Sequence, residues 1–85
     1  LGGAAEIFAP AGGVVTWASR QGDQVAKDAV IGHVTDPVTR IRHPVVSPVD
    51  GILFRQELWR SALRGQGLCH VAGQDVVREG DLLSD

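Results

Sequence analysis

The sequence has no excess of basic residues, no long apolar run and only one cysteine. Eight basic and ten acidic residues give a net charge of −2, which leaves no electrostatic basis for binding nucleic acid. No apolar run approaches the roughly 20 residues that cross a bilayer, so no membrane partner is expected. A single cysteine, Cys69, cannot form an intrachain disulfide. A reducing compartment, the cytoplasm, is therefore the expected location.

The N-terminal end lacks both an initiator methionine and the basic region that opens a signal peptide. Residues 1–5, Leu-Gly-Gly-Ala-Ala, are interpreted as the remnant of a linker, and residues 6–85 as a single β-domain from a longer protein. A chain of 85 residues provides for one small core and no second one. Its hydrophobic content of 44% is that of a folded domain rather than a disordered tail.

One turn pattern occurs twice. Residues 9–15 and 47–53 both begin with a small residue and proline and continue through glycine into an apolar run. The two turn prolines, Pro10 and Pro48, lie 38 positions apart. Proline fixes φ and glycine accepts positive φ, so each copy predicts a turn that leads into a strand.

A second pair of segments ends both repeats. Residues 31–34 and 68–71 both finish in His-Val, at an offset of 37. The sequence therefore predicts two half-domains that close over one another about a pseudo-two-fold axis and bury apolar faces that neither could bury alone. No apolar pattern predicts a helix of ten or more residues, so the expected fold class is all-β. Strands are expected at residues 6–9, 13–18, 52–54 and 68–72, short bent strands between 25 and 34, a charged hairpin at 38–42, a less regular segment at 55–64, and a last turn and strand at 75–83.

Three of these motifs together resemble the biotinyl/lipoyl barrel-sandwich hybrid. That family reads G-D-x-V-x-x-G-x-x-L-x-x-I, then a hairpin presenting a modifiable lysine, then A-P-x-D-G. Residues 22–34 and 47–51 follow this pattern, with Asp28 in place of the usual glycine and Ser47 in place of alanine. The resemblance implies a barrel-sandwich hybrid of two pseudo-symmetric half-motifs.

The modifiable lysine of that family has no counterpart here. Counting eight positions back from the proline of the second turn reaches Arg40, and counting forward from the first half reaches Val38. The only lysine of the chain, Lys27, lies in the glycine turn instead. An arginine guanidinium stays protonated and is not an acylatable amine. The chain is therefore expected to carry neither biotin nor lipoate.

A more specific resemblance is to the C-terminal β-domain of the succinylglutamate desuccinylase/aspartoacylase family. It rests on Ile-Phe-Ala-Pro-x-x-Gly-Val-Val at 7–15, the Gly-Asp-x-Val turn at 22–25, the Asp-Pro hairpin at 36–37 and Gly-x-x-Leu-x-His-Val-Ala at 65–72. The resemblance implies a zinc-dependent hydrolase that cleaves the amide bond of an N-acylated amino acid. In that family an N-terminal domain binds zinc through His-x-x-Glu and a later histidine.

None of that catalytic machinery is present in these 85 residues. No His-x-x-Glu occurs, and His33, His43 and His70 do not have the spacing of zinc ligands. The chain is thus expected to contain no catalytic residue and no metal site. The resemblance implies an accessory C-terminal domain that shapes active-site access or supports a homo-oligomer, with its own N-terminal catalytic domain as partner. The alternative is a stand-alone binding or assembly module of the hybrid-barrel type.

Four residues are candidates for contact with a substrate or partner. Arg40, Arg42 and His43 cluster on the predicted hairpin, where they could hold a carboxylate through bidentate contacts. The alternative is a solvated hairpin face. Trp59 either covers the core or contacts a domain that is absent from this chain.

Three further residues, His33, His70 and Cys69, have both a structural and a functional interpretation, and Trp17 has a structural one only. Trp17 is expected in the core. His33 and His70 occupy equivalent places, so they could face each other as a metal-binding or pH-sensing pair, or point to solvent as ordinary strand residues. Cys69, in an apolar strand, is interpreted as a buried structural thiol rather than a nucleophile.

Overall fold

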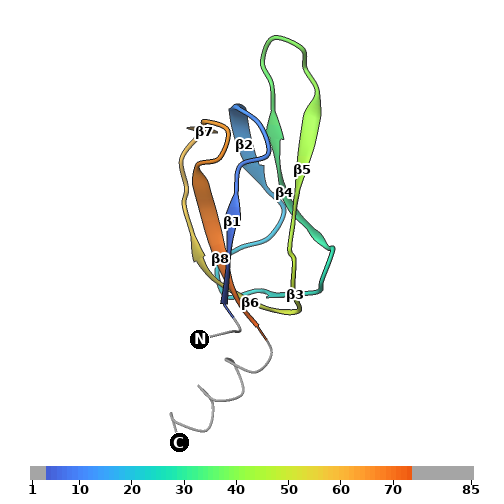
Figure 1. Ribbon diagram of the computed structural model, residues 1–85, viewed down its shortest axis with the longest axis vertical. Coiled ribbons are helices and arrows are strands. Elements are labelled where there is room, and N and C mark those ends of the chain that lie inside the picture. The colour runs from blue at the N-terminus through green and yellow to red at the C-terminus, as the bar shows by residue number, and fades with distance from the viewer. Residues whose placement is uncertain (1–3, 74–85) are drawn as a thin grey trace, which may run out of the picture.

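The computed structural model describes residues 4–73, which form two four-stranded antiparallel sheets and no helix (Figure 1). One sheet has the strand order β1-β8-β6-β3 and the other β5-β4-β2-β7. Within this part of the chain, no helix is long and apolar enough to cross a membrane. The strands are β1 (Ala4–Phe8), β2 (Gly13–Trp17), β3 (Gln24–Val25), β4 (Val30–Thr35), β5 (Arg42–Val46), β6 (Gly51–Gln56), β7 (Ser61–Ala62) and β8 (Gly67–Gly73).

The strand orders of the two sheets are related by exchanging the two halves of the chain. Replacing β1 by β5, β2 by β6, β3 by β7 and β4 by β8, and the reverse, converts one order into the other. Each half supplies the central pair of one sheet and both edge strands of the other. Neither half can therefore complete a sheet by itself, as the repeated sequence motifs predict.

Backbone hydrogen bonds repeat in the two halves with the same offsets. In each half, the proline turn is clamped to the glycine turn of the other half by two bonds. In each half, the amide of a buried residue on a central strand (Val15 on β2, Leu53 on β6) also donates a hydrogen bond to a carbonyl that lies just before a short edge strand (β7 and β3, respectively). The three pairs are Asp28 N–Ser47 O (2.7 Å) with Gly65 N–Ala9 O (2.9 Å), Ser47 N–Ala29 O (3.0 Å) with Ala9 N–Gln66 O (2.8 Å), and Leu53 N–Asp23 O (2.9 Å) with Val15 N–Arg60 O (2.8 Å).

The two glycine turns also share a left-handed residue. Gly65 has φ 83°, and the equivalent residue of the first half, Asp28, has φ 70°. Asp28 is the residue that replaces glycine in the hybrid-barrel pattern. Aspartate is one of the few non-glycine residues that visit this region, so the substitution leaves the turn conformation intact.

Equivalent β-bulges direct apolar side chains into the space between the sheets. Ile31 is the extra residue of β4 against β5, and Leu68 is the extra residue of β8 against β1. Both side chains are almost completely buried, which stabilises the fold by about 1.5–3 kcal/mol each. The buried core consists of Ile7, Ala9, Val15, Val25, Ile31, Val34, Val45, Leu53, Ala62, Leu68, Cys69 and Val71.

The strands predicted within residues 4–73 are present, and three details differ from expectation. Trp17 is only partly buried at the edge of the core, where its Nε1 donates to the Glu57 carbonyl at 3.1 Å. The segment 55–64, expected to be irregular, contains β7, which forms because β2 offers it a pairing edge. β6 has a bulge at Phe54 that β2 lacks, so the repeat offset is not constant. The strand expected at 75–83 lies outside the described residues.

Two glycines permit close backbone approaches at equivalent places. A Cβ on Gly13 would overlap the Thr35 carbonyl, and one on Gly51 would overlap the Ala72 carbonyl. We expect Gly51→Ala to lower the free energy of unfolding by about 2–3 kcal/mol, because the backbone of β8 must move. Urea denaturation measures the change.

The matched control is Gly12→Ala. A Cβ there would lie at ordinary contact distances, 3.7 Å from the Ala62 carbonyl oxygen and 3.9 Å from the Arg64 nitrogen. Its unfolding free energy should stay within about 0.5 kcal/mol of the parent. Equal effects of the two substitutions would show that the close approach at Gly51 is not a constraint on the fold.

Candidate functional site

The hairpin between β4 and β5 projects beyond the rest of the molecule (Figure 1). Its loop is held by Asp36, whose carboxylate accepts the amides of Val38 at 2.8 Å and Thr39 at 3.1 Å. The Arg40 amide donates to the Asp36 carbonyl at 2.7 Å, and Arg40 takes a positive φ of 64°. These bonds fix the loop backbone and present the Arg40 side chain to solvent.

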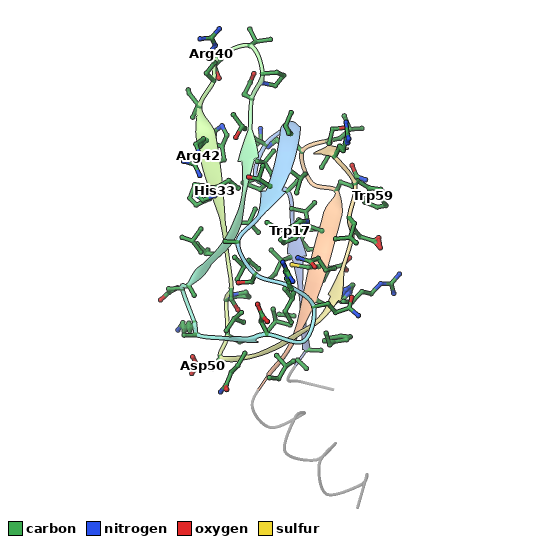
Figure 2. The ribbon with its side chains drawn as sticks, turned by 180° about the vertical axis from the view of Figure 1, so that it is seen from behind. Trp17, His33, Arg40, Arg42, Asp50 and Trp59 are labelled. Carbon is green, nitrogen blue, oxygen red and sulfur yellow. The ribbon has the colours of Figure 1, made fainter. Side chains whose placement is uncertain are left out.

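Arg42 and His43 follow the loop on β5. The Arg42 guanidinium lies 3.2 Å from His33 Nδ1 across the hairpin, as Figure 2 shows for the labelled side chains. A guanidinium only donates hydrogen bonds, so Nδ1 accepts and a neutral His33 carries its proton on Nε2. His43 lies opposite Val34 in the β4–β5 pairing and is partly exposed. The arrangement can bind a carboxylate, because Arg40 and Arg42 project from one end of the molecule.

Trp59 lies apart from this hairpin (Figure 2). It follows β6, is 47% exposed, and lines a groove of about 440 Å³ with residues of β1, β6 and β8. Arg40, Arg42 and His43 thus belong to one hairpin, in which the consecutive residues Arg42 and His43 point to opposite faces of β5, and Trp59 lies apart from them.

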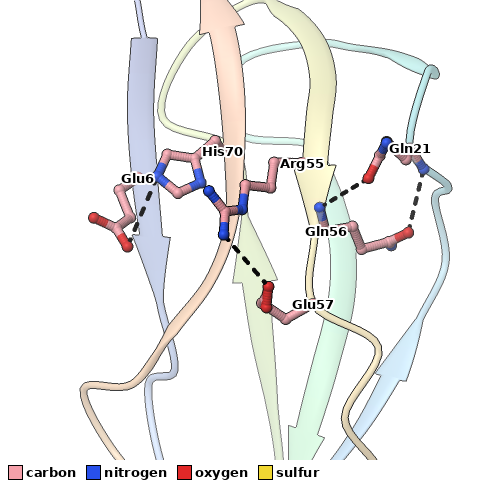
Figure 3. Close-up of polar contacts among 6 residues, drawn as sticks. All are labelled: Glu6, Gln21, Arg55, Gln56, Glu57 and His70. Carbon is pink, nitrogen blue, oxygen red and sulfur yellow. Dashed lines mark hydrogen bonds and ion pairs between the residues drawn. The ribbon is translucent and has the colours of Figure 1, made fainter.

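The groove beside Trp59 is lined by a row of ionisable side chains that crosses three strands (Figure 3). Glu6 on β1 lies 3.8 Å from His70 Nε2 on β8, and Arg55 Nη2 on β6 lies 4.0 Å from Glu57. Both distances are long and the side chains are partly exposed, so each contact contributes little to stability. Sequence reasoning did not find this row, because only the strand pairing brings Glu6, His70 and Arg55 side by side.

His33 and His70 do not face each other. His33 lies on β4 and contacts Arg42, whereas His70 lies on β8 between Glu6 and the Phe54 ring, whose centroid is 5.6 Å away. Residues 4–73 contain no group of three or more histidine, cysteine, aspartate or glutamate side chains placed to hold a metal ion. His70 Nδ1 is buried without a hydrogen-bond partner among the described residues.

Cys69 is a buried thiol, in agreement with its structural interpretation. Its side chain is 1% exposed and belongs to the core. Burial raises the pKa of the Cys69 thiol to about 11, because a thiolate is poorly solvated there. At neutral pH the thiol is therefore protonated and unreactive.

These features define an all-β domain of two interlocked halves, with a cationic hairpin at one end and a polar groove on one sheet. The sequence matches no protein-family model and no curated protein. The fold is similar to part of a succinylglutamate desuccinylase/aspartoacylase family protein from Shewanella amazonensis, with a TM-score of 0.76 and 16% identity over 85% of this chain. It is also similar to part of the ectoine utilization protein EutE (DoeB) from Ruegeria pomeroyi, in its apo structure (TM-score 0.75, 14% identity) and its product-bound structure (0.71, 15%), each over 81% of this chain.

The match covers only a fraction of those proteins. The chain spans 21% of the Shewanella protein and 22% of EutE, about a fifth of their length. The same fold thus occurs as one part of much longer chains.

The Asp36 carboxylate gives the hairpin a testable pH dependence. The amides of Val38 and Thr39, with a smaller contribution from His43, hold the pKa of Asp36 below its usual 3.8. The hairpin contacts should persist while the carboxylate is ionised and be lost as pH falls through the lowered pKa, below 3.8. The measurement is the amide shift of Val38 and Thr39 followed by NMR from pH 7 to 2.

Asp36→Ala should remove the low-pH transition in those two amides and increase their hydrogen exchange at pH 7. Asp50→Ala is the matched control, because Asp50 also accepts a backbone amide, that of Lys27 at 2.7 Å, away from the hairpin. Hairpin amide shifts that stay constant to pH 2 in the parent protein would contradict this role of Asp36.

Proposed function

We propose that this chain is the accessory C-terminal β-domain of a zinc-dependent hydrolase of the succinylglutamate desuccinylase/aspartoacylase type. The observation that carries the proposal is the fold similarity, which covers 81–85% of this chain but only 21–22% of the three structures. Such coverage fits a single domain of a longer enzyme. The motifs at 7–15, 22–25 and 65–72 support the same assignment independently.

In this proposal the chemistry belongs to an N-terminal domain that these 85 residues do not include. That domain would bind zinc, which polarises an amide carbonyl and lowers the pKa of bound water during hydrolysis of an N-acyl amino acid. The β-domain contributes no catalytic group. It adopts the two-halved arrangement of a barrel-sandwich hybrid and serves as a rigid support for residues at the mouth of the active site.

The cationic hairpin is the part of the domain suited to influence substrate access. Every N-acyl amino acid carries a carboxylate, and Arg40 and Arg42 present guanidinium groups from a loop that is already ordered. An ordered loop loses little entropy when a ligand binds. We assign the hairpin residues Arg40, Arg42 and His43 to substrate capture, and an oligomer contact is the second role that their exposure permits.

The alternative function is a stand-alone hybrid-barrel module for binding or assembly. The observation in its favour is the polar groove beside Trp59, which is a feature of the domain itself. The two functions differ in what the complete reading frame encodes. The accessory-domain proposal requires a preceding region, whereas the module does not.

The first test of the hydrolase assignment is the complete reading frame and its purified product. We expect a preceding region of about 200 residues that contains His-x-x-Glu and a later histidine. The purified product should bind about one zinc ion by elemental analysis and hydrolyse members of an N-acyl amino acid panel. A reading frame without that motif rejects the assignment, and zinc-dependent hydrolysis by residues 1–85 alone rejects the accessory role.

The second test concerns the hairpin in the complete enzyme. Arg42→Ala should raise KM about tenfold and change kcat less than about twofold, because a charge-assisted contact made equally in the ground and transition states is lost. Arg42→Lys should restore only part of the affinity, since lysine cannot form a bidentate contact.

Lys27→Ala is the matched control, because it removes an exposed cation from the glycine turn and leaves the hairpin intact. Its KM should equal that of the parent. An unchanged KM in Arg42→Ala, or an equal increase in Lys27→Ala, would remove the hairpin from substrate capture.

A further inference from the structure

The groove beside Trp59 carries charges that the other half of the chain does not repeat. On its floor His70 of β8 is paired directly with Glu6 of β1 and Arg55 of β6. His33 is the equivalent histidine of the other sheet, and its two directly paired neighbours are uncharged. These are Pro44 on β5 and Thr16 on β2. The fold therefore requires neither the carboxylate of Glu6 nor the guanidinium of Arg55.

Trp59 is a second difference between the halves. The Arg60 carbonyl accepts an amide of a central strand, as the Asp23 carbonyl does in the other half. The residues that precede them, Trp59 and Gly22, therefore occupy equivalent places. Trp59 is 47% exposed and lines the groove. Because the fold needs no large side chain at this place, the indole ring can serve as a wall for a ligand.

Gly67 provides the space that the Glu6 side chain occupies. A Cβ on Gly67 would lie 2.5 Å from Glu6 Oε2. The equivalent residue of the first half, at the offset of 37, is Val30, so the strand does not demand glycine here. Glycine at position 67 thus lets the Glu6 carboxylate lie against β8, where both residues line the groove.

The charged groups of the groove retain hydrogen-bonding capacity for a ligand. The Glu6–His70 and Arg55–Glu57 separations are 3.8 and 4.0 Å (Figure 3). A charge-assisted hydrogen bond is shorter, at about 2.7–2.9 Å. Arg55 and Glu57 are two residues apart in extended chain and project to the same face of the sheet. A guanidinium and a carboxylate are therefore presented side by side and are not bonded to each other.

The charges of the groove indicate the class of ligand. Among residues 4–73, and with His70 neutral, the groove contains two carboxylates, on Glu6 and Glu57, and one guanidinium, on Arg55. A complementary ligand carries one carboxylate and two cationic groups, as a free basic α-amino acid does. The groove volume of about 440 Å³ is that of a small-molecule site. A metal ion is not the complement, because these residues include no group of three or more potential metal ligands.

We propose that the groove binds a free basic α-amino acid of the lysine or arginine type. Arg55 binds the α-carboxylate, Glu57 the α-ammonium group and Glu6 the cation of the side chain. Trp59 packs against the ligand and contributes a cation–π contact. The inference goes beyond the proposed function and does not depend on it, because every residue of the site belongs to the β-domain itself.

Titration calorimetry of the complete protein with L-lysine tests the proposal, and one site per chain is expected. Three analogues each lack one of the charged groups. 6-Aminohexanoate lacks the α-ammonium group, L-lysinamide lacks the carboxylate, and L-norleucine lacks the side-chain ammonium group. Each should bind at least about tenfold more weakly than L-lysine, because one charge-assisted contact is lost.

Variants then locate the binding site. Arg55→Gln should weaken L-lysine binding at least about tenfold. Arg64→Gln is the matched control and should not change it, because Arg64 is exposed and lies outside the groove. Glu6→Gln should remove the preference for L-lysine over L-norleucine, since Glu6 is assigned to the side-chain cation. Circular dichroism verifies that the variants remain folded.

The proposal is overturned if L-lysine shows no saturable binding up to about 10 mM. It is also overturned if Arg55→Gln and Arg64→Gln bind L-lysine alike, or if Glu6→Gln keeps the preference of the parent protein. Failure of the proposed function is separately visible. A reading frame without the zinc motif rejects the hydrolase assignment, whereas absence of L-lysine binding in an active zinc hydrolase rejects only the amino-acid site.

Discussion

The clamping of each proline turn onto the glycine turn of the other half is the contact on which the rest of the structure depends. Two hydrogen bonds form each clamp. In each clamp one of the two donors is the amide of a residue at positive φ, which is Asp28 in one clamp and Gly65 in the other. With these bonds in place, each half contributes the centre of one sheet and the edges of the other. Burial of Ile31 and Leu68 follows, because the bulges that carry them lie beside the clamps. Folding of the halves is consequently interdependent.

Much of this architecture could be predicted from the sequence, because glycine and proline at fixed offsets have only a few conformational uses. The repeated Pro-x-x-Gly turns and the repeated His-Val endings predicted the two halves. Sequence reasoning could not find the row formed by Glu6, His70 and Arg55, since the register of β1, β8 and β6 is set by tertiary pairing. Nor could it separate Trp59 from the hairpin arginines, because nothing local to residue 59 determines which end of the molecule it faces.

Because the two halves share one backbone plan, positions where they differ carry information about function. A side chain that the fold requires should recur in the equivalent place, as Ile31 and Leu68 do in the core. An exposed side chain that does not recur at the equivalent position of the other half is not required by the fold. Trp59 belongs to this second class, because the corresponding residue of the first half is Gly22. A duplicated fold thus supplies an internal comparison even though no family model matches the sequence.

The ordered loop of the β4–β5 hairpin determines how its exposed side chains are presented. The hairpin of the first half projects at the position where the hybrid-barrel pattern presents lysine, and here it presents Arg40 from a loop stabilised by Asp36. A modifiable lysine must be reachable and reactive, whereas a permanently charged guanidinium needs only to be exposed and oriented. Under the proposed function, an arginine at this position therefore serves anion recognition, whereas a lysine there would offer an acylatable amine.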